Sequence, residues 1–412
     1  MIRLVETLVP RRLGIPFRWL MTSSWATNLA DGFSMAAGPL LVASQTHDPF
    51  LISLAALVQW LPPFVFGLPA GALSDRLDRR RLVLAVNAVR VVVLALLVTA
   101  IVAGAVSIVL VLAALFLLGS AEVFADNTSS TLLPMLVHRD DLTIGNARLG
   151  FGMITLNQLA GPPLGAAMFA AGAAWPFAGE AVLVLAGIAL FSRIVLPEHG
   201  RTAEDEGHLL ADVAEGFRWV RHNPAVRTLV LTILSFNVTY GAAWSVLVLY
   251  AREQLGLGPV GFGLITTVIG LGGLLGTATY GWITRHVSLG DLMRIGLVYE
   301  TLTHLGLALT THAAVALPIF FGFGAHAFIW GTTSMTVRQR AVPAHLQVRV
   351  GSVNMIGMYG GLVAGAALGG LLARAGNVTT PFWFAFGGSA VLVVLIWGQL
   401  THIAHQDAAE AA

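Results

Sequence analysis

The sequence predicts an all-α membrane protein whose twelve transmembrane helices form two pseudo-symmetric six-helix bundles, and three observations support this. Of the 412 residues, 56% are hydrophobic and only 11% are charged, whereas soluble domains carry about 25% charged residues. Long apolar stretches recur along the whole chain, each with roughly the 20 residues that cross a bilayer core. The second half of the chain also repeats residues of the first half at a nearly constant offset.

Each predicted helix is an apolar stretch that ends at charged residues or at a Gly or Pro turn. In the first half, helices are predicted over 17–43, 50–73, 82–103, 107–131, 146–171 and 176–196. In the second half, they are predicted over 226–250, 261–284, 291–311, 315–337, 349–373 and 381–402. Twelve spans need about 240 apolar residues, which is close to the supply in this chain.

The longest polar segment lies between the sixth and seventh predicted helices and indicates a linker between two bundles. The predicted parts are an N-terminal bundle over 1–196, a cytoplasmic linker over 197–224 and a C-terminal bundle over 225–412. In the linker, Leu210, Val213, Phe217 and Val220 recur at helical spacing. This pattern favours an amphipathic helix that lies on the membrane surface.

The basic residues predict the orientation of the chain in the membrane. All 23 are Arg, and cytoplasmic loops retain positive charge during insertion. With the N-terminus in the cytoplasm, nearly all Arg lie in or beside inner loops, and only Arg252 and Arg374 face outward. We therefore expect a multi-pass protein of the bacterial plasma (inner) membrane with both termini in the cytoplasm. The apolar stretch after Arg11 and Arg12 is too long for a cleavable signal.

Several chemistries are excluded by what the sequence lacks. It contains no Cys, which excludes disulfides, thiolate metal sites and Cys nucleophiles. No phosphate-binding loop or other nucleotide motif is present, and no His spacing is typical of a metal site. The sequence thus predicts no metal, no cofactor, no nucleic-acid partner and no enzymatic activity.

The internal repeat is clearest in two pairs of predicted helices. At an offset of 204 residues, Gly161 and Gly165 correspond to Gly365 and Gly369. At an offset of 209 residues, the matching pairs are Arg18 with Arg227, Asn28 with Asn237 and Gly32 with Gly241. Several matches at nearly one offset favour duplication of a six-helix unit over chance.

The loop after the second predicted helix carries the most specific motif. Residues 71–81 read GALSDRLDRRR, which resembles the G-x-L-A-D-R-x-G-R-R signature of the major facilitator superfamily. Asp78 replaces the usual Gly of this signature, a variant that resembles the drug and siderophore exporter branch, with relatives of macrolide-efflux proteins and the enterobactin exporter. The resemblance implies the two-bundle fold, secondary transport and a monomer.

The resemblance also implies a gate. Asp75 is expected to face the N-terminal end of the helix over 349–373, near Arg349, while Arg76 and Arg79 hold neighbouring acids when the inner side is closed. The residues Gly161, Pro162 and Gly165 match the core of the antiporter motif of the superfamily. Pro within a span frees backbone groups and permits a kink, so this segment is expected to bend during alternating access; plain helix packing is the alternative.

Charged residues inside apolar spans are costly, so each is a functional hypothesis. They are Asp31, Arg90, Glu122, Asp126, Arg148, Glu180 and Glu300. Resemblance implies that the first, fourth, seventh and tenth helices line the cavity, which singles out Asp31, Glu122 and Asp126 for proton coupling. A carboxylate bonded within its own helix is the alternative for Asp31. For Arg90 and Arg148, snorkelling or pairing with an acid is expected.

Polar and aromatic residues on the same four helices predict the substrate site. Asn28 and Met35 share a helical face with Asp31. The other candidates, on the seventh and tenth helices, are Asn237, Tyr240, Trp244, Phe323, His326 and Trp330. Aromatic walls suit a lipophilic ligand and can hold a cation; an aromatic belt or bundle core is the alternative.

Together these features predict proton-coupled efflux of neutral or cationic amphipathic small molecules by alternating access, an antiport in which proton and substrate compete for one carboxylate. An importer of the same fold, a lysolipid or siderophore transporter, and a non-transporting membrane sensor remain as alternatives. The antiporter-like segment favours export over import.

Overall fold

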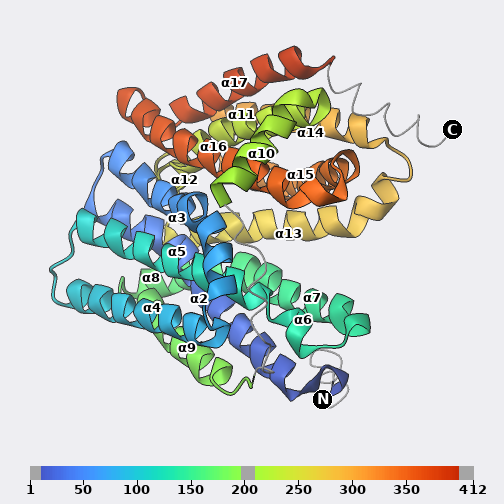
Figure 1. The fold of residues 1–412 in the computed structure, drawn as a ribbon. Coiled ribbons are helices and arrows are strands. Elements are labelled where there is room, and N and C mark those ends of the chain that lie inside the picture. The colour runs from blue at the N-terminus through green and yellow to red at the C-terminus, as the bar shows by residue number, and fades with distance from the viewer. Residues whose placement is uncertain (1–10, 196–208, 399–412) are drawn as a thin grey trace. The chain divides into compact units, whose positions relative to one another are not determined.

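The computed structural model describes residues 11–195 and 209–398, and all regular elements in these ranges are helical (Figure 1). The predicted amphipathic position Leu210 has no described side chain, and residues 197–208 of the predicted linker lie outside the described residues. The first-half elements are η1 (Arg11–Leu13), α2 (Gly14–Gln45), α3 (Pro49–Arg76), α4 (Arg79–Val102), α5 (Ile108–Ser130), α6 (Leu133–Leu136), η2 (Arg139–Asp141), α7 (Leu142–Phe151), η3 (Gly152–Ala160), α8 (Gly161–Ala171) and α9 (Trp175–Phe191).

The second half begins with α10 (Leu209–His222), a helix of the predicted linker. The elements that follow are α11 (Pro224–Trp244), α12 (Leu247–Leu249), η4 (Tyr250–Gln254), α13 (Pro259–Ile283), α14 (Leu289–Leu309), α15 (Ala313–Ala341), η5 (Ala344–Leu346), α16 (Gln347–Ala375) and α17 (Thr380–Ile396). Seven described helices are long and apolar enough to cross a membrane, and α9 and α17 are shorter apolar helices. Within the described residues, every predicted span contains a helix or a run of helical elements, which confirms the all-α membrane fold.

Local sequence explains where many helices begin. Asp78, Ser107, Asn223 and Ser288 each accept a hydrogen bond from a backbone N–H in the first turn of the helix that follows. Such capping satisfies donors that have no partner inside the helix. A second group of helices carries Pro in the first turn, where its missing N–H costs nothing; these are α9, α11, α13 and α17.

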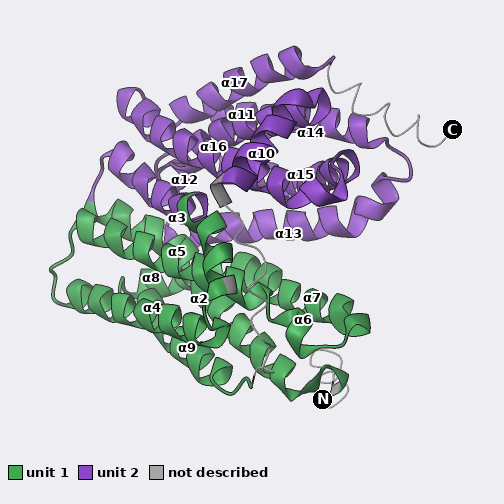
Figure 2. Ribbon diagram, viewed as in Figure 1, with its two compact units in different colours: residues 1–45, 65–206 green, residues 46–64, 207–412 purple. Residues whose placement is uncertain are grey.

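The chain divides into two compact units, residues 1–45 with 65–206, and residues 46–64 with 207–412 (Figure 2). The first part of α3 thus belongs to the second unit by its contacts. The predicted division at residues 196 and 225 follows the chain order of the bundles and stays a prediction.

The internal repeat reappears as the same helix crossing inside each unit. In the first unit, a Cβ placed on Gly161 of α8 would lie 2.5 Å from the Cα of Gly32 on α2. In the second unit, a Cβ placed on Gly365 of α16 would lie 3.0 Å from the Cα of Gly241 on α11. Only glycines permit such close backbone approach, so the paired glycines preserve one packing contact in both halves.

The next repeat pair behaves in the same way. A Cβ on Gly165 would lie 2.4 Å from the carbonyl oxygen of Phe33, and a Cβ on Gly369 would lie 2.1 Å from that of Ala242. Phe33 and Ala242 are themselves 209 residues apart in the chain. The two halves therefore share helix geometry where most side chains differ.

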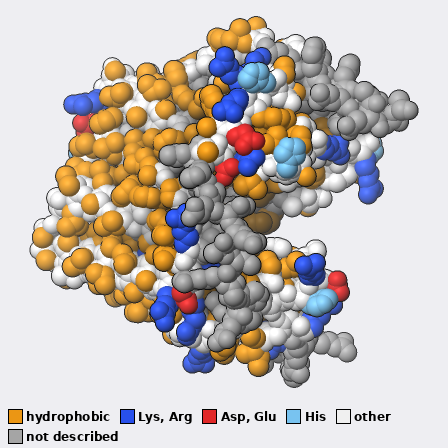
Figure 3. Space-filling model, in the orientation of Figure 1, with side chains coloured by type: hydrophobic (Ala, Val, Ile, Leu, Met, Phe, Trp, Pro, Cys, Tyr) orange, Lys and Arg blue, Asp and Glu red, His pale blue; other side chains and the backbone are white. Residues whose placement is uncertain are grey.

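Apolar side chains cover much of the molecular surface. Exposed Val, Leu, Ile, Phe and Trp side chains occur on most of the spanning helices, and on the face in Figure 3 they predominate at the left while most charged side chains lie toward the right. In water such an extensive apolar surface would be a liability, but lipid chains cover it without cost.

Candidate functional site

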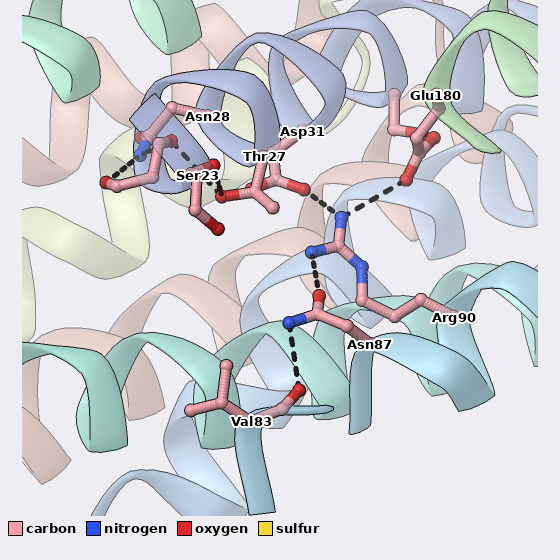
Figure 4. Close-up of polar contacts among 10 residues, drawn as sticks. Ser23, Thr27, Asn28, Asp31, Val83, Asn87, Arg90 and Glu180 are labelled. Atoms are coloured by element: carbon pink, nitrogen blue, oxygen red, sulfur yellow. Dashed lines mark hydrogen bonds and ion pairs between the residues drawn. The ribbon is translucent and has the colours of Figure 1, made fainter. Parts of the chain in front are cut away.

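The first unit contains a buried ionic cluster built from three helices. Arg90 of α4 directs its guanidinium toward Asp31 of α2 and Glu180 of α9 (Figure 4). Arg90 Nη2 pairs with Asp31 Oδ1 and lies 3.4 Å from Glu180 Oε1. The exposed fractions are 2% for Arg90, 6% for Asp31 and 1% for Glu180. The single positive charge of Arg90 is therefore paired with two acids that are shielded from solvent.

Neighbouring polar groups hold the cluster in place. Ser34, one turn after Asp31 on α2, donates a hydrogen bond to Glu180 Oε2. Asn87, one turn before Arg90, accepts from Arg90 Nη1 at 3.4 Å and donates to the carbonyl of Val83 at 3.0 Å. The Arg90 Nε is buried and has no hydrogen-bond partner among the described residues. The site thus holds an unsatisfied donor beside its two carboxylates.

For Asp31 and Arg90, the structure shows which contacts each side chain makes. Asp31 pairs with another helix instead of bonding within its own, and Arg90 pairs with acids in the interior instead of snorkelling to the surface. Sequence reasoning recognised all three residues as charges inside spans but grouped none of them. Their chain separation, 59 residues from Asp31 to Arg90 and 90 from Arg90 to Glu180, hides the pairing.

The other two predicted proton-coupling acids both lie on α5 and differ in burial. Glu122 of α5 is half-buried and interacts electrostatically with Asp31, Arg90 and Glu180. Asp126, one turn later on the same helix, is exposed. Asp126 also interacts electrostatically with Asp31 and Arg90. Both acids of α5 therefore act on the buried pair, and Glu122 is the less exposed of the two.

The remaining predicted residues of α2 are Asn28 and Met35. Asn28 donates to Ser24 within α2, to the carbonyl at 2.8 Å and to Oγ at 3.2 Å. Met35 is half-buried, one turn beyond Asp31. Neither side chain joins the ionic cluster.

The second unit brings predicted aromatic residues of α11 and α15 into direct contact. Tyr240 and Trp244 stack at 4.5 Å between ring centroids, and Phe323 lies 5.7 Å from Tyr240 and 4.6 Å from Trp244. Tyr240 and Trp244 are half-buried while Phe323 is buried. We call these three side chains the aromatic wall.

Other predicted binding residues lie beside the wall or apart from it. His326 is 6.2 Å from Phe323 and 6.3 Å from Trp330, so it lies between these two aromatic side chains of α15. Asn237 donates to the carbonyl of Ile233 in its own helix at 2.7 Å and packs against Gly361. Asn237 therefore serves a helix crossing and not the wall.

Sequence reasoning missed the importance of α14. Glu300 was recognised only as a charge in a span, and His304 was not considered, yet both are buried beside His326. Their spacing of one helical turn was the available signal.

The predicted gate residues are described only in part. The side chain of Asp75 lies outside the described residues, whereas Arg76 is exposed at the end of α3. Arg79 donates from Nε to the carbonyl of Ser74 at 3.4 Å, and its Nη1 lies 3.1 Å from Met135 Sδ. Asp78 caps α4 by accepting from the backbone N–H of Arg81 at 2.8 Å. This explains how Asp replaces Gly in the motif, because both residue types are tolerated as N-caps.

Arg349 has partners on the linker helix. Its Nε lies 2.9 Å from Asp212 Oδ1 and its Nη1 lies 2.9 Å from Glu215 Oε2. A Cβ on Gly216 would lie 2.5 Å from the Arg349 carbonyl oxygen, so α10 packs closely on the start of α16. Val220 is buried against α11 and α16, whereas Phe217 is 63% exposed. On the predicted apolar face of this helix, one side chain therefore packs against other helices while another is exposed.

The segment around Pro162 combines close packing with irregular backbone. The π-helix η3 ends at Ala160 and is capped by Gly161, whose N–H bonds to the carbonyl of Leu156, and Pro162 is buried. Pro supplies no N–H to the preceding turn, and π-helical turns occur often at functional sites. Close packing and an irregular backbone are thus both present here, and the predicted bend during alternating access stays a prediction.

Comparison with known proteins agrees with this architecture. Residues 6–412 match a family described as transmembrane secretion effectors. The chain is 28% identical over 385 residues to the multidrug efflux pump Tap of Mycolicibacterium fortuitum, covering 89% of this chain and 91% of Tap. It is 24% identical over 395 residues to the enterobactin exporter EntS of Citrobacter koseri, covering 93% of this chain and 92% of EntS.

Solved structures share the fold. A single-residue mutant of the nucleoside transporter NupG superimposes with a TM-score of 0.77 at 8% identity, over 93% of this chain and 99% of NupG. A bacterial homologue of the iron transporter ferroportin gives a TM-score of 0.71 at 14% identity, over 93% of this chain and 98% of the homologue. The chain therefore belongs to the transmembrane secretion effector family and is an efflux transporter of the major facilitator type, a multi-pass membrane protein and not an enzyme.

Proposed function

We propose that this transporter couples the export of neutral or cationic amphipathic small molecules to proton entry. The single observation that carries the proposal is the buried cluster of Asp31, Arg90 and Glu180. With both acids ionised, the cluster has one more negative charge than positive, and Glu122 interacts with it as a third acid. Uncompensated charge in a low-dielectric interior is costly.

A proton removes this excess charge. If the cluster takes up a proton from the outside when the substrate leaves, and releases it to the cytoplasm when the next substrate binds, the two fluxes become opposed. In this scheme Asp31 and Glu122 exchange protons, and Arg90 keeps a fixed charge. Asp126, the more exposed acid of α5, passes protons to Glu122.

The aromatic wall and the residues around it support a lipophilic substrate. Tyr240 and Trp244 offer half-buried ring faces, and such faces bind apolar groups and cations. We assign Asn28, Met35, His326 and Trp330 to the surrounding lining. The inner gate is assigned to Asp75, Arg76, Arg79 and Arg349, and the bend to the segment from Gly161 to Gly165. The protein is proposed to act as a monomer in the bacterial plasma membrane, with both termini in the cytoplasm.

The test measures transport of ethidium, a fluorescent lipophilic cation, in inverted membrane vesicles. In these vesicles an imposed proton gradient, acid inside, should drive ethidium accumulation by the wild-type protein. Asp31→Asn should reduce the gradient-driven rate by at least about tenfold, as expected when a coupling group is lost. Asp291→Asn, which removes an exposed acid on α14, should transport normally. Equal accumulation after the gradient is collapsed would refute proton coupling.

The enterobactin exporter relatives raise siderophores as a second candidate substrate. Catechol rings could stack on the aromatic wall in the same way as other lipophilic rings. Growth of expressing cells across antibiotics, dyes and siderophores distinguishes the two classes, with Asp31→Asn as the inactive control. Protection against lipophilic cations alone supports the drug-export proposal, whereas release of siderophore alone contradicts it.

A further inference from the structure

A second group of ionisable side chains lies in the second unit and includes none of the residues assigned to proton exchange. Glu300 of α14 is 7% exposed, His304 of the same helix is fully buried and His326 of α15 is 9% exposed. Glu300 Oε1 lies 3.9 Å from His304 Nε2, and Oε2 lies 3.6 Å from His326 Nε2. Each carboxylate oxygen thus faces a different imidazole.

This carboxylate lacks the strong partner that Asp31 has. Both distances exceed the range of a hydrogen bond, about 2.7–3.2 Å for N–H···O. Among the described residues, the ion-pair partners found for Glu300 are these two imidazoles, and no Arg lies within pairing distance. Within the described parts of the chain, both ring nitrogens of His304 are buried and have no hydrogen-bond partner. Leaving such groups unsatisfied is costly unless something binds between them.

The unsatisfied groups adjoin the aromatic wall. The Trp244 ring lies 5.9 Å from His304 in an edge contact, and Phe323 lies 6.2 Å from His326. Tyr240 is the third member of the wall and interacts electrostatically with Glu300. A buried negative charge therefore sits beside aromatic rings, two of which are half-buried.

These features are complementary to one kind of ligand. A carboxylate supplies a counter-ion, and ring faces attract a cation while accommodating its apolar part. A metal ion is not favoured, because among the described side chains no group of three His, Asp or Glu is placed to hold one. An organic cation with an attached aromatic group meets both requirements.

We propose that Glu300 and the aromatic wall of Tyr240, Trp244 and Phe323 form a binding site for the charged end of amphipathic organic cations. His304 and His326 are the alternative partners of the carboxylate when no cation is present. The inference deepens the proposed function, on which it rests, by placing charge recognition in the second unit and proton exchange in the first.

The test is equilibrium binding to the purified full-length protein in nanodiscs, without any gradient. The probes are trimethyl(1-naphthylmethyl)ammonium and its uncharged carbon isostere 1-neopentylnaphthalene, each corrected for binding to empty nanodiscs. Wild-type protein should prefer the cation over the isostere by at least about tenfold, the size expected for a desolvated charge contact. Absence of this preference would overturn the proposal.

Two variants test whether Glu300 causes the preference for the cation. Glu300→Gln should abolish it and leave the affinity for the isostere unchanged. His326→Lys should also abolish it, because a fixed cation beside Glu300 would occupy the carboxylate. If one variant does not yield monodisperse protein, the test is made with the other variant alone. Asp291→Asn removes an exposed acid from the same helix and should retain the full preference. Retention of the preference in either folded test variant would overturn the proposal.

The outcome is separable from that of the proton-coupling proposal. Binding without a gradient does not depend on antiport. Ethidium transport that ignores the proton gradient would refute the coupling, whereas a cation preference that survives the loss of Glu300 would refute only this site.

Discussion

At the scale of single residues, the function proposed here depends on charges that cannot reach water. Arg90 is 2% exposed and holds Asp31 and Glu180 from two other helices. Pairs of this kind contribute little net stability when intact, but removal of one partner leaves the other buried and uncompensated. The cluster is therefore both a vulnerable point of the fold and a place where one proton changes the local charge balance.

This vulnerability gives a prediction for Arg90. Arg90→Gln should lower the free energy of unfolding by about 3–5 kcal/mol, since it leaves two buried acids without a cation. The measurement is thermal unfolding in detergent. Asp31→Asn added to Arg90→Gln should recover part of the loss because it removes one unpaired charge, while Arg252→Gln, at an exposed pair, should have almost no effect. A double variant no more stable than Arg90→Gln would contradict the charge-balance explanation.

At the scale of elements, the glycine crossings are the structural counterpart of the sequence repeat. Gly161 on Gly32 and Gly365 on Gly241 bring α8 against α2 and α16 against α11 at backbone contact. In the first unit the crossing directly follows a π-helical segment. Close packing and π-helical backbone therefore occur together in one helical run.

The crossing predicts opposite effects for two glycines of this run. Gly161→Ala should destabilise the protein by about 1–3 kcal/mol, because the new methyl group would overlap the backbone of Gly32. Gly150→Ala in α7 has open space around its Cβ position and should stabilise by up to about 1 kcal/mol through helix propensity. Thermal unfolding of the two variants measures both changes in stability. Equal effects at the two sites would argue against the close crossing.

At the scale of the whole molecule, the distribution of Arg predicts the topology. The chain contains no Cys, so single introduced cysteines report accessibility without background. Arg252→Cys should react with a membrane-impermeant maleimide in intact cells, because its loop is predicted to face outward. Arg139→Cys, in a predicted inner loop, should react only after the cells are opened. The reverse labelling pattern would invert the orientation and place both termini outside.

Much of the fold was predictable because the signals are local. Observed helices begin and end within a few residues of the predicted ones, as with α2 over Gly14–Gln45 and α14 over Leu289–Leu309. Of the substrate candidates, Tyr240, Trp244 and Phe323 do meet. Spacing predicts the helical face of each residue, and the resemblance implies that both helices line one cavity. The composite backbone of α7, η3 and α8 was not predictable in detail, because π-helical turns have no distinctive composition.

By itself the sequence determined the helical membrane architecture, the duplicated halves and the family, because apolar length, helical period and short motifs are properties of neighbouring residues. Only the tertiary structure decided which charges share a site. Arg90 joins Asp31 and Glu180, Arg349 joins the linker helix, and Glu300 lies between two imidazoles. The physical reason is that pairing of buried charges depends on which helices pack together and how each is rotated, and residues dozens of positions apart carry no local record of that choice.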